Sequence, residues 1–304
     1  MKALASFILR GSSQAILATV GFAVLSLMLP PLGILSGAAL ALVTLRQGGR
    51  QGAVVTLGST VFVAVLAYFS LGNPAPALVF LAGLWLPLWG LAWVLRETRS
   101  LGLAVVAAAG LGVAGVLLTY LLLGDVSAWW LKVLNEVFAP VLQEGGPLSG
   151  ETEKVSAALA TISRVMTGIM ASGMVLNSVT CLFLARAWQA QLFNPGGFRE
   201  EFHQLRLNQG LAGVTLLLAL LFALPLGVLS SVAGDMLLVL LGVYLLQGLA
   251  VAHGVVAARK LHLAWLMATY VLAFFVLPQL MLLIALLGLL DTRLDFRRRL
   301  TGRT

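Results

Sequence analysis

The stretch LGLAVVAAAGLGVAGVLLTYLLL, residues 101–123, decides the fold class because it contains no charged side chain. An α-helix rises 1.5 Å per residue and the hydrocarbon core of a bilayer is about 30 Å thick, so a crossing takes roughly 20 apolar residues. The stretch therefore predicts one membrane-spanning helix. With the similar runs on both sides of it, the full-length candidates are residues 52–71, 76–95, 101–123, 165–187, 210–229 and 235–257.

The composition of the whole chain supports the same class. Hydrophobic residues make up 60% of the chain and charged residues 10%, whereas soluble domains average about 45–50% and about 25%. A soluble domain of this size would not cover its surface with so little charge. We therefore expect an all-α fold, a polytopic transmembrane helical bundle, with residues 1–304 in a single integral membrane domain.

The basic residues predict how the spans alternate. Short basic loops carry Arg46 and Arg50, Arg96 and Arg99, Arg186, Arg199 and Arg206, and Arg259 and Lys260. The alternate loops, GNPA (72–75) and SSVAGD (230–235), contain no Lys or Arg. Because Lys and Arg collect on cytoplasmic loops, we expect the basic loops inside. The net charge of +8 then reflects topology, and we expect no nucleic-acid partner.

Two further apolar regions are interrupted by proline, which breaks the hydrogen-bond ladder of a helix. Residues 14–45 are divided at Pro30-Pro31, and residues 263–290 at Pro278. The first region lacks a small-residue cleavage site, so it is expected to stay in place and cross twice as short helices. The second is expected to form a re-entrant hairpin or two short spans. Both termini are then cytoplasmic, and the chain has about 8–10 membrane segments.

Residues 124–164 form the long outward connection, and their pattern is helical. Apolar residues recur at helical spacing from Val126 through Trp129 and Trp130 to Leu142. This pattern predicts an external amphipathic helical insertion at the outer interface, with its tryptophans at headgroup depth. Two roles are open for it: a connector that rests on the lipid, or a lid over an outward-facing cavity.

The sequence lacks the motifs of catalysis and metal binding. It has no glycine followed by lysine and serine or threonine, as a nucleotide-binding P-loop requires. The three histidines show no ligand spacing, and a single cysteine, Cys181, forms neither a disulfide framework nor a zinc site. The acidic residues lie in loops and at helix ends, which weakens the case for an ion-coupled carrier. We therefore expect no enzyme, no cofactor and no metal.

Few polar side chains lie at membrane depth, and each is a candidate site residue because a polar group is costly in lipid. Asn177 is expected to form an interhelical hydrogen bond. On residues 235–257, Tyr244 and Gln247 share one face, and His253 lies about 120° from Gln247 at 3.6 residues per turn. For Gln247 and His253, lining a binding cavity and packing are equally consistent with the sequence.

Two regularly spaced patterns have both a functional and a structural interpretation. Tryptophans stand at every fourth position of one span, at Trp85, Trp89 and Trp93. They suit stacking on a flat ligand, although packing or interface anchoring is more typical of such a stripe. Small residues recur in the same way at Gly33, Gly37 and Ala41. This ridge suits close helix contact, either within the chain or with another subunit.

The expected cytoplasmic loop, residues 188–209, contains the signals of a turn and a short helix. NPGG (194–197) is typical of a tight turn. After it, Phe198 and Phe202 are spaced to form the apolar side of a short amphipathic helix at the membrane surface.

Three segments carry a resemblance to a known family. They are LARAWQAQLFNPGGFREEFHQLRLNQG (184–210), YLLQGLAVAHGVVAARK (244–260) and GLLDTRLDFRRR (288–299). They resemble the YybS-like family of bacterial inner-membrane proteins, most specifically in the Pro-Gly-Gly-Phe-Arg and Asp-Phe-Arg motifs. That family is similar to the substrate-binding S components of energy-coupling-factor transporters, which bind vitamins or similar solutes and are driven by a separate ATPase module.

The resemblance implies a multi-pass protein of the bacterial inner membrane that binds or transports a small solute without an ATPase of its own. A separate ATPase and coupling module is the implied partner, although a standard S component has six spans, fewer than expected here. On this hypothesis an outward cavity lies under residues 124–163 and is lined from 76–95 and 235–257. The alternatives are a non-transporting membrane factor that organises partners through the basic loops, and a lipid-handling protein, which the interfacial helices suggest.

The chain closes on a basic cytoplasmic tail, residues 291–304. Asp291 follows an apolar run and is suited to cap a new helix. Arg297, Arg298 and Arg299 are expected to face anionic headgroups of the membrane lipids, each contributing about 1 kcal/mol near the surface. The tail then acts as a topological anchor, and a docking site for a cytoplasmic partner is the alternative.

Overall fold

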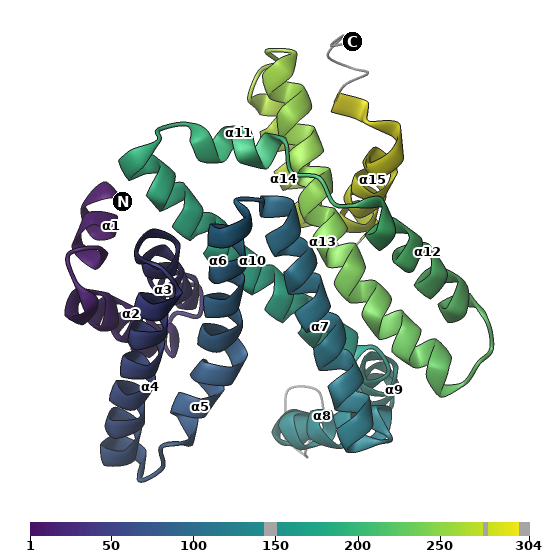
Figure 1. The fold of residues 1–304 in the computed structure, drawn as a ribbon. Coiled ribbons are helices and arrows are strands. Elements are labelled where there is room, and N and C mark those ends of the chain that lie inside the picture. Colours follow the sequence, from purple (N-terminus) through teal and green to yellow (C-terminus); the bar gives the residue numbers. More distant parts are fainter. Residues whose placement is uncertain (143–150, 276–278, 298–304) are drawn as a thin grey trace.

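The computed structural model describes residues 1–142, 151–275 and 279–297, and every regular element within these ranges is helical (Figure 1). The all-α polytopic bundle predicted from the sequence is therefore confirmed. Five described helices are long and apolar enough to cross a membrane: α4 (Gly49–Leu71), the continuous segment Ala75–Thr98, α7 (Leu101–Leu123), α10 (Met166–Phe193) and α13 (Val228–Ala258). The segment Ala75–Thr98 consists of α5 (Ala75–Phe80), the π-helical turn η1 (Leu81–Trp85) and α6 (Leu86–Thr98).

The remaining helices are shorter. They are α1 (Lys2–Ile8), α2 (Ser12–Ser26), α3 (Leu32–Gln47), α8 (Val126–Leu142), α9 (Thr152–Ser163), α11 (Gly197–His203), α12 (Gln209–Ala223), α14 (Ala264–Phe275) and α15 (Gln279–Leu294). The helices predicted in the 124–164 insertion are present as α8 and α9. The tight turn predicted at 194–197 is also present, closed by a 3.0 Å hydrogen bond from the Gly197 N–H to the Asn194 carbonyl.

One predicted span is too long. The sequence analysis expects a helix over 210–229, whereas α12 contains 15 residues. Pro225 disfavours a helical conformation at Leu224, whose backbone is extended at φ −93° and ψ 145°. Gly227, at φ +60°, then precedes α13. Residues 230–235, expected to be a loop, consequently belong to a helix.

The core of the first half centres on α3, which α2, α4, α6 and α10 enclose. The break predicted at Pro30-Pro31 separates α2 from α3, and residues 36–45 of α3 are all buried. A Cβ added to Gly37 would lie 2.8 Å from Sγ of Cys181, so this glycine lets α3 approach α10 closely. The other two small residues are placed similarly: Gly33 lies against α2, and Ala41 is fully buried. The small-residue ridge therefore makes contacts within the chain.

The break predicted at Pro278 lies outside the described residues, between α14 and α15. α15 runs beside α13 in the same direction, because Gly248 packs on the backbone of Ile284 and, further along α13, Gly254 packs on the side chain of Arg297. The last described residues therefore lie near the end of α13 (Figure 1).

The connections between helices lie at the two ends of the bundle, with the basic connections at one end (Figure 1). The α3–α4, α6–α7, α10–α12 and α13–α14 connections lie together at one end, which we call the basic end because it carries the arginine-rich loops. The connections at 72–74, 124–125 and 224–227 lie at the opposite end, together with α8 and α9. The alternation predicted from loop charge is thus present in the fold.

Candidate functional site

The strongest candidate for a ligand site is a cleft of about 520 Å³ between α6, α7 and α10. Most of its lining is small or apolar and includes Ala82, Gly83, Pro87, Gly115, Met170 and Met174. Thr119, Thr167 and Ser178 add hydroxyl groups. A mostly apolar hollow with a few polar groups is typical of small-molecule sites.

The local sequence leaves space in two walls of the cleft, at η1 and at α7. η1 is a π-helical turn, and Pro87 follows it at the start of α6 without an N–H to donate. Such turns are frequent at functional sites. A Cβ added to Gly115 would find no atom within 4 Å, and one added to Gly83 would meet only Cε of Met174, at 3.9 Å. The two glycines therefore leave space that a side chain would fill.

Trp130 of α8 forms one end of the cleft. Its indole N–H donates to the hydroxyl of Thr167 over 2.8 Å, which ties α8 to the start of α10. The hydroxyls of Ser127 and Ser163, 3.4 Å apart, join α8 to α9. The neighbouring Trp129 packs edge-on against Trp130 and is 40% exposed. The insertion therefore contributes a side chain to the lining of the cleft as well as connecting α7 to α10.

Asp235 braces the helices around this end of the cleft. It is 2% exposed, although the sequence analysis places it in a loop. The Tyr120 hydroxyl donates to Oδ2 over 2.8 Å, and the Gly168 backbone N–H donates to Oδ1 over 3.0 Å. These bonds join α7, α10 and α13. The sequence contains a signal for this role, because an acidic residue at the end of a long apolar run usually forms hydrogen bonds or ion pairs with other groups of the protein.

The three tryptophans of the second span do not line the cleft. Trp85 is fully buried, and its indole N–H donates to the Ser36 hydroxyl of α3 over 3.2 Å. Trp89 donates to the Gly49 carbonyl at the start of α4 over 2.8 Å. Trp93 is 47% exposed and also packs on Gly49. The stripe joins this segment to α3 and α4.

Gln247 and Tyr244 lie in a second polar centre, at the basic end. Gln247 is fully buried; its Oε1 accepts from the Leu207 N–H over 2.9 Å, and its Nε2 donates to the Gly288 carbonyl over 2.8 Å. Tyr244 is buried beside Gly288, where the two helix backbones touch. Gln247 thus joins α13 to α15 and to the chain that precedes α12.

His253 and Asn177 lie apart from both centres. His253 Nδ1 is 2.9 Å from the Leu249 carbonyl, and its Nε2 is 3.4 Å from the Tyr270 hydroxyl of α14. Asn177 is exposed on α10, and among the described residues its side chain has no hydrogen-bond partner. The interhelical hydrogen bond expected of Asn177 is therefore not formed within this part of the chain.

The cavity predicted under residues 124–163 has one of its two expected walls. Residues 82–91 line the cleft from the 76–95 side, as expected. The other walls come from α7 and α10 in place of 235–257. The reason is that α13 packs against both α7 and α10, where Val239 lies against Gly112 beside Val175, so α7 and α10 stand between α13 and the cleft.

Arg297 turns toward the protein instead of facing headgroups. Its Nη2 lies 2.7 Å from Oδ2 of Asp291, and their side chains are 14% and 0% exposed. Nη1 donates to the carbonyls of His203 and Leu205. The Asp291 Oδ1 accepts from the Phe296 N–H over 2.9 Å, which closes the end of α15. Arg298 and Arg299, the other two arginines of the predicted anchor, lie outside the described residues.

Comparison with known proteins identifies the family. Neither a curated protein nor a solved structure matches the chain. One family model does match, over residues 16–292, and its description is predicted membrane protein (DUF2232). This is consistent with the resemblance of the sequence to the YybS-like membrane proteins. Because the match covers most of the 304 residues, the chain belongs to the DUF2232 family of predicted membrane proteins.

Proposed function

We propose that this chain is a membrane-embedded binding protein for a small, largely apolar molecule, held in the cleft between α6, α7 and α10. The observation that carries the proposal is the cleft itself, about 520 Å³ in volume and lined in part by Trp130 of α8. Ligand sites commonly have volumes of about 300–1,000 Å³.

The chemistry of the lining supports a flexible or variable apolar ligand. Met170 and Met174 reach the cleft from α10, and methionine adapts its shape to irregular partners. The hydroxyls of Thr119 and Thr167 already have partners, the Gly115 carbonyl and the Trp130 indole. Few polar groups are therefore left for a strongly hydrophilic solute.

The resemblance to S components extends the proposal to uptake. On this proposal the chain hydrolyses nothing itself, and a separate ATPase and coupling module engages the basic end. The protein then lies in a bacterial inner membrane with its basic end in the cytoplasm, in keeping with the bias of Lys and Arg toward that side.

The test is native mass spectrometry of the protein, purified in mild detergent from its own host at its natural level. We expect a stoichiometric apolar adduct on the wild type and its loss in Gly115→Phe, because Gly115 lines the cleft and a Cβ added there meets no atom within 4 Å, so the larger side chain takes up ligand space. Gly110→Phe is the matched control, because Gly110 is equally open on α7 but does not line the cleft.

The mass of the adduct decides between the candidate ligands. A soluble apolar compound supports solute uptake, whereas a phospholipid or free acyl chain supports the lipid-handling alternative that the apolar lining also suits. A wild-type protein that carries no adduct and only cytoplasmic partners would contradict the proposal and favour a role in organising those partners.

A further inference from the structure

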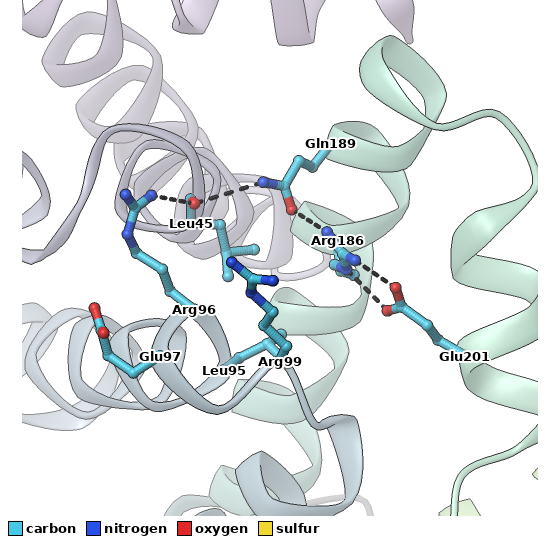
Figure 2. A pocket seen from close by; sticks show the side chains of 8 residues that line it. All are labelled: Leu45, Leu95, Arg96, Glu97, Arg99, Arg186, Gln189 and Glu201. Atoms are coloured by element: carbon cyan, nitrogen blue, oxygen red, sulfur yellow. Dashed lines mark hydrogen bonds and ion pairs between the residues drawn. The ribbon is translucent and has the colours of Figure 1, made fainter.

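The basic end contains a second cavity, of about 550 Å³, with an entirely different lining (Figure 2). It lies where α3, α6, α10 and α11 meet. Its polar lining consists of Arg96, Glu97, Arg99, Arg186, Gln189 and Glu201. Three of these side chains are guanidinium groups, and they come from two helices that are distant in sequence.

Two of the arginines are held in place by neighbouring groups. Arg186 forms a two-pronged ion pair with Glu201, in which Nε lies 2.8 Å from Oε2, and it also donates to Gln189. Arg96 Nη1 donates to the Leu45 carbonyl at the end of α3 over 2.7 Å. The Gln189 amide donates to the same carbonyl. The geometry of the cavity wall is therefore fixed before any ligand arrives.

Arg99 differs from both, because its side chain has no ion pair or hydrogen bond to any described residue. It ends α6 in the left-handed conformation, at φ +52°. This conformation is unfavourable for a residue with a Cβ. It aims the guanidinium between Arg96 and Arg186 (Figure 2). Glu97 points away from that gap (Figure 2).

The charges of the cavity do not cancel. Glu201 neutralises Arg186, while Arg96 is bound only by a neutral carbonyl and Arg99 is bound by no described side chain. With Glu97 included, the lining of three arginines and two glutamates carries a net charge of +1, and the guanidinium groups of Arg96 and Arg99 form no ion pair with a described carboxylate. The planar fork of a guanidinium matches the oxygens of a phosphate group and binds them through charge-assisted hydrogen bonds.

We propose that this cavity binds a phosphate group, with Arg99 and Arg96 as its ligands and the Arg186–Glu201 pair as the rigid wall. The phosphate belongs either to the headgroup of an anionic phospholipid or to a soluble phosphate compound. A bound phosphate joins the ends of α3, α6 and α10, so it stabilises the folded protein by mass action.

The experiment measures thermal unfolding of the full chain in phosphatidylcholine nanodiscs. One arm adds phosphatidic acid to the bilayer, and the other adds inorganic phosphate to the buffer. We expect bound phosphate to raise the midpoint temperature of the wild type. In Arg99→Gln we expect the apparent affinity for phosphate to fall about tenfold or more, since one charge-assisted hydrogen-bond donor is lost. Arg50→Gln is the control, because Arg50 is an exposed arginine at the same end that does not line the cavity.

The two arms separate the sources of phosphate. A rise with phosphatidic acid alone assigns a lipid headgroup, and a rise with inorganic phosphate as well assigns a soluble compound. No rise in either arm overturns the proposal. An equal loss of affinity in Arg50→Gln also overturns it, because the effect is then one of general surface charge. Arg99 is exposed, and Arg99→Gln removes no hydrogen bond or ion pair to a described residue, so we expect it to fold and unfold like the wild type without ligand.

Discussion

Two buried aspartates hold the two ends of the bundle, and their partners differ in charge. At the end opposite to the basic end, Asp235 accepts hydrogen bonds from two neutral donors, the Tyr120 hydroxyl and the Gly168 backbone N–H. At the basic end, Asp291 lies 2.7 Å from the guanidinium of Arg297. In the arrangement around Asp235, the Gly168 N–H belongs to the first turn of α10, where the backbone N–H groups have no partner within the helix. Such N–H groups favour a carboxylate, and no second charge is buried.

This difference predicts which end of the fold is more easily destabilised by a substitution. A buried ion pair is weak evidence for net stability, yet removing one member is strongly destabilising because the other charge stays buried. Removing a neutral donor forfeits one hydrogen bond of about 1 kcal/mol. We therefore expect the basic end to tolerate the loss of one partner less well than the opposite end.

The largest effect is expected from Arg297→Gln. It leaves the carboxylate of Asp291 buried without its charged partner, which should lower the free energy of unfolding by about 3 kcal/mol. This loss of unfolding free energy is measured by unfolding the protein in mixed micelles of dodecyl maltoside and sodium dodecyl sulfate. Adding Asp291→Asn to this variant should recover most of the loss, since no charge then remains buried. A double variant as unstable as the single one would show that the ion pair does not set the cost.

Asp235→Ala is expected to cost less, about 2 kcal/mol, because it forfeits two hydrogen bonds to neutral donors. Tyr120→Phe removes only one of the two and should cost about 1 kcal/mol. Both are measured in the same micelles. If Asp235→Ala proves more damaging than Arg297→Gln, the contrast between the two ends is reversed.

Trp130→Phe should have a smaller effect, about 1 kcal/mol, because it removes the single hydrogen bond from α8 to Thr167. It should also weaken retention of the apolar adduct, since Trp130 forms one end of the cleft. Trp129→Phe is the matched control: Trp129 is 40% exposed, and its indole N–H makes no hydrogen bond to a described residue. Equal adduct loss in both variants would show that α8 does not cover the ligand.

The sequence predicts the fold well where helices end at strong local signals. The span expected at 101–123 is α7 residue for residue. Ser100 caps its start by accepting from the Leu103 N–H over 3.3 Å, and Gly124, at φ +65°, ends it. The span expected at 210–229 fails because hydropathy alone ignores the break at Pro225.

The candidate site was less predictable, because apolar periodicity defines a helix face but not the partner of that face. The tryptophan stripe points to α3 and α4, while the cleft depends on residues without side chains, such as Gly83 and Gly115. Arg297 shows the same limit. Its charge is plain in the sequence, but its inward direction follows the left-handed turn at Asp295, at φ +50°.

The smallest expected effect is a dependence on pH at the basic end. His203 of α11 is half-buried, and desolvation, followed by the charges of Arg199, His253 and Arg297, lowers the pKa of its imidazole below the ordinary value. The unfolded chain then binds a proton more readily than the folded one as pH falls below about 6.5. This contribution to stability is full above that pH and is lost progressively below it. The midpoint of unfolding should therefore decrease when the pH is lowered from 7 to 5, and it should decrease less in His203→Gln than in the wild type. Replacing the exposed His262 is the control, and an unchanged slope in His203→Gln would assign the pH dependence to another group.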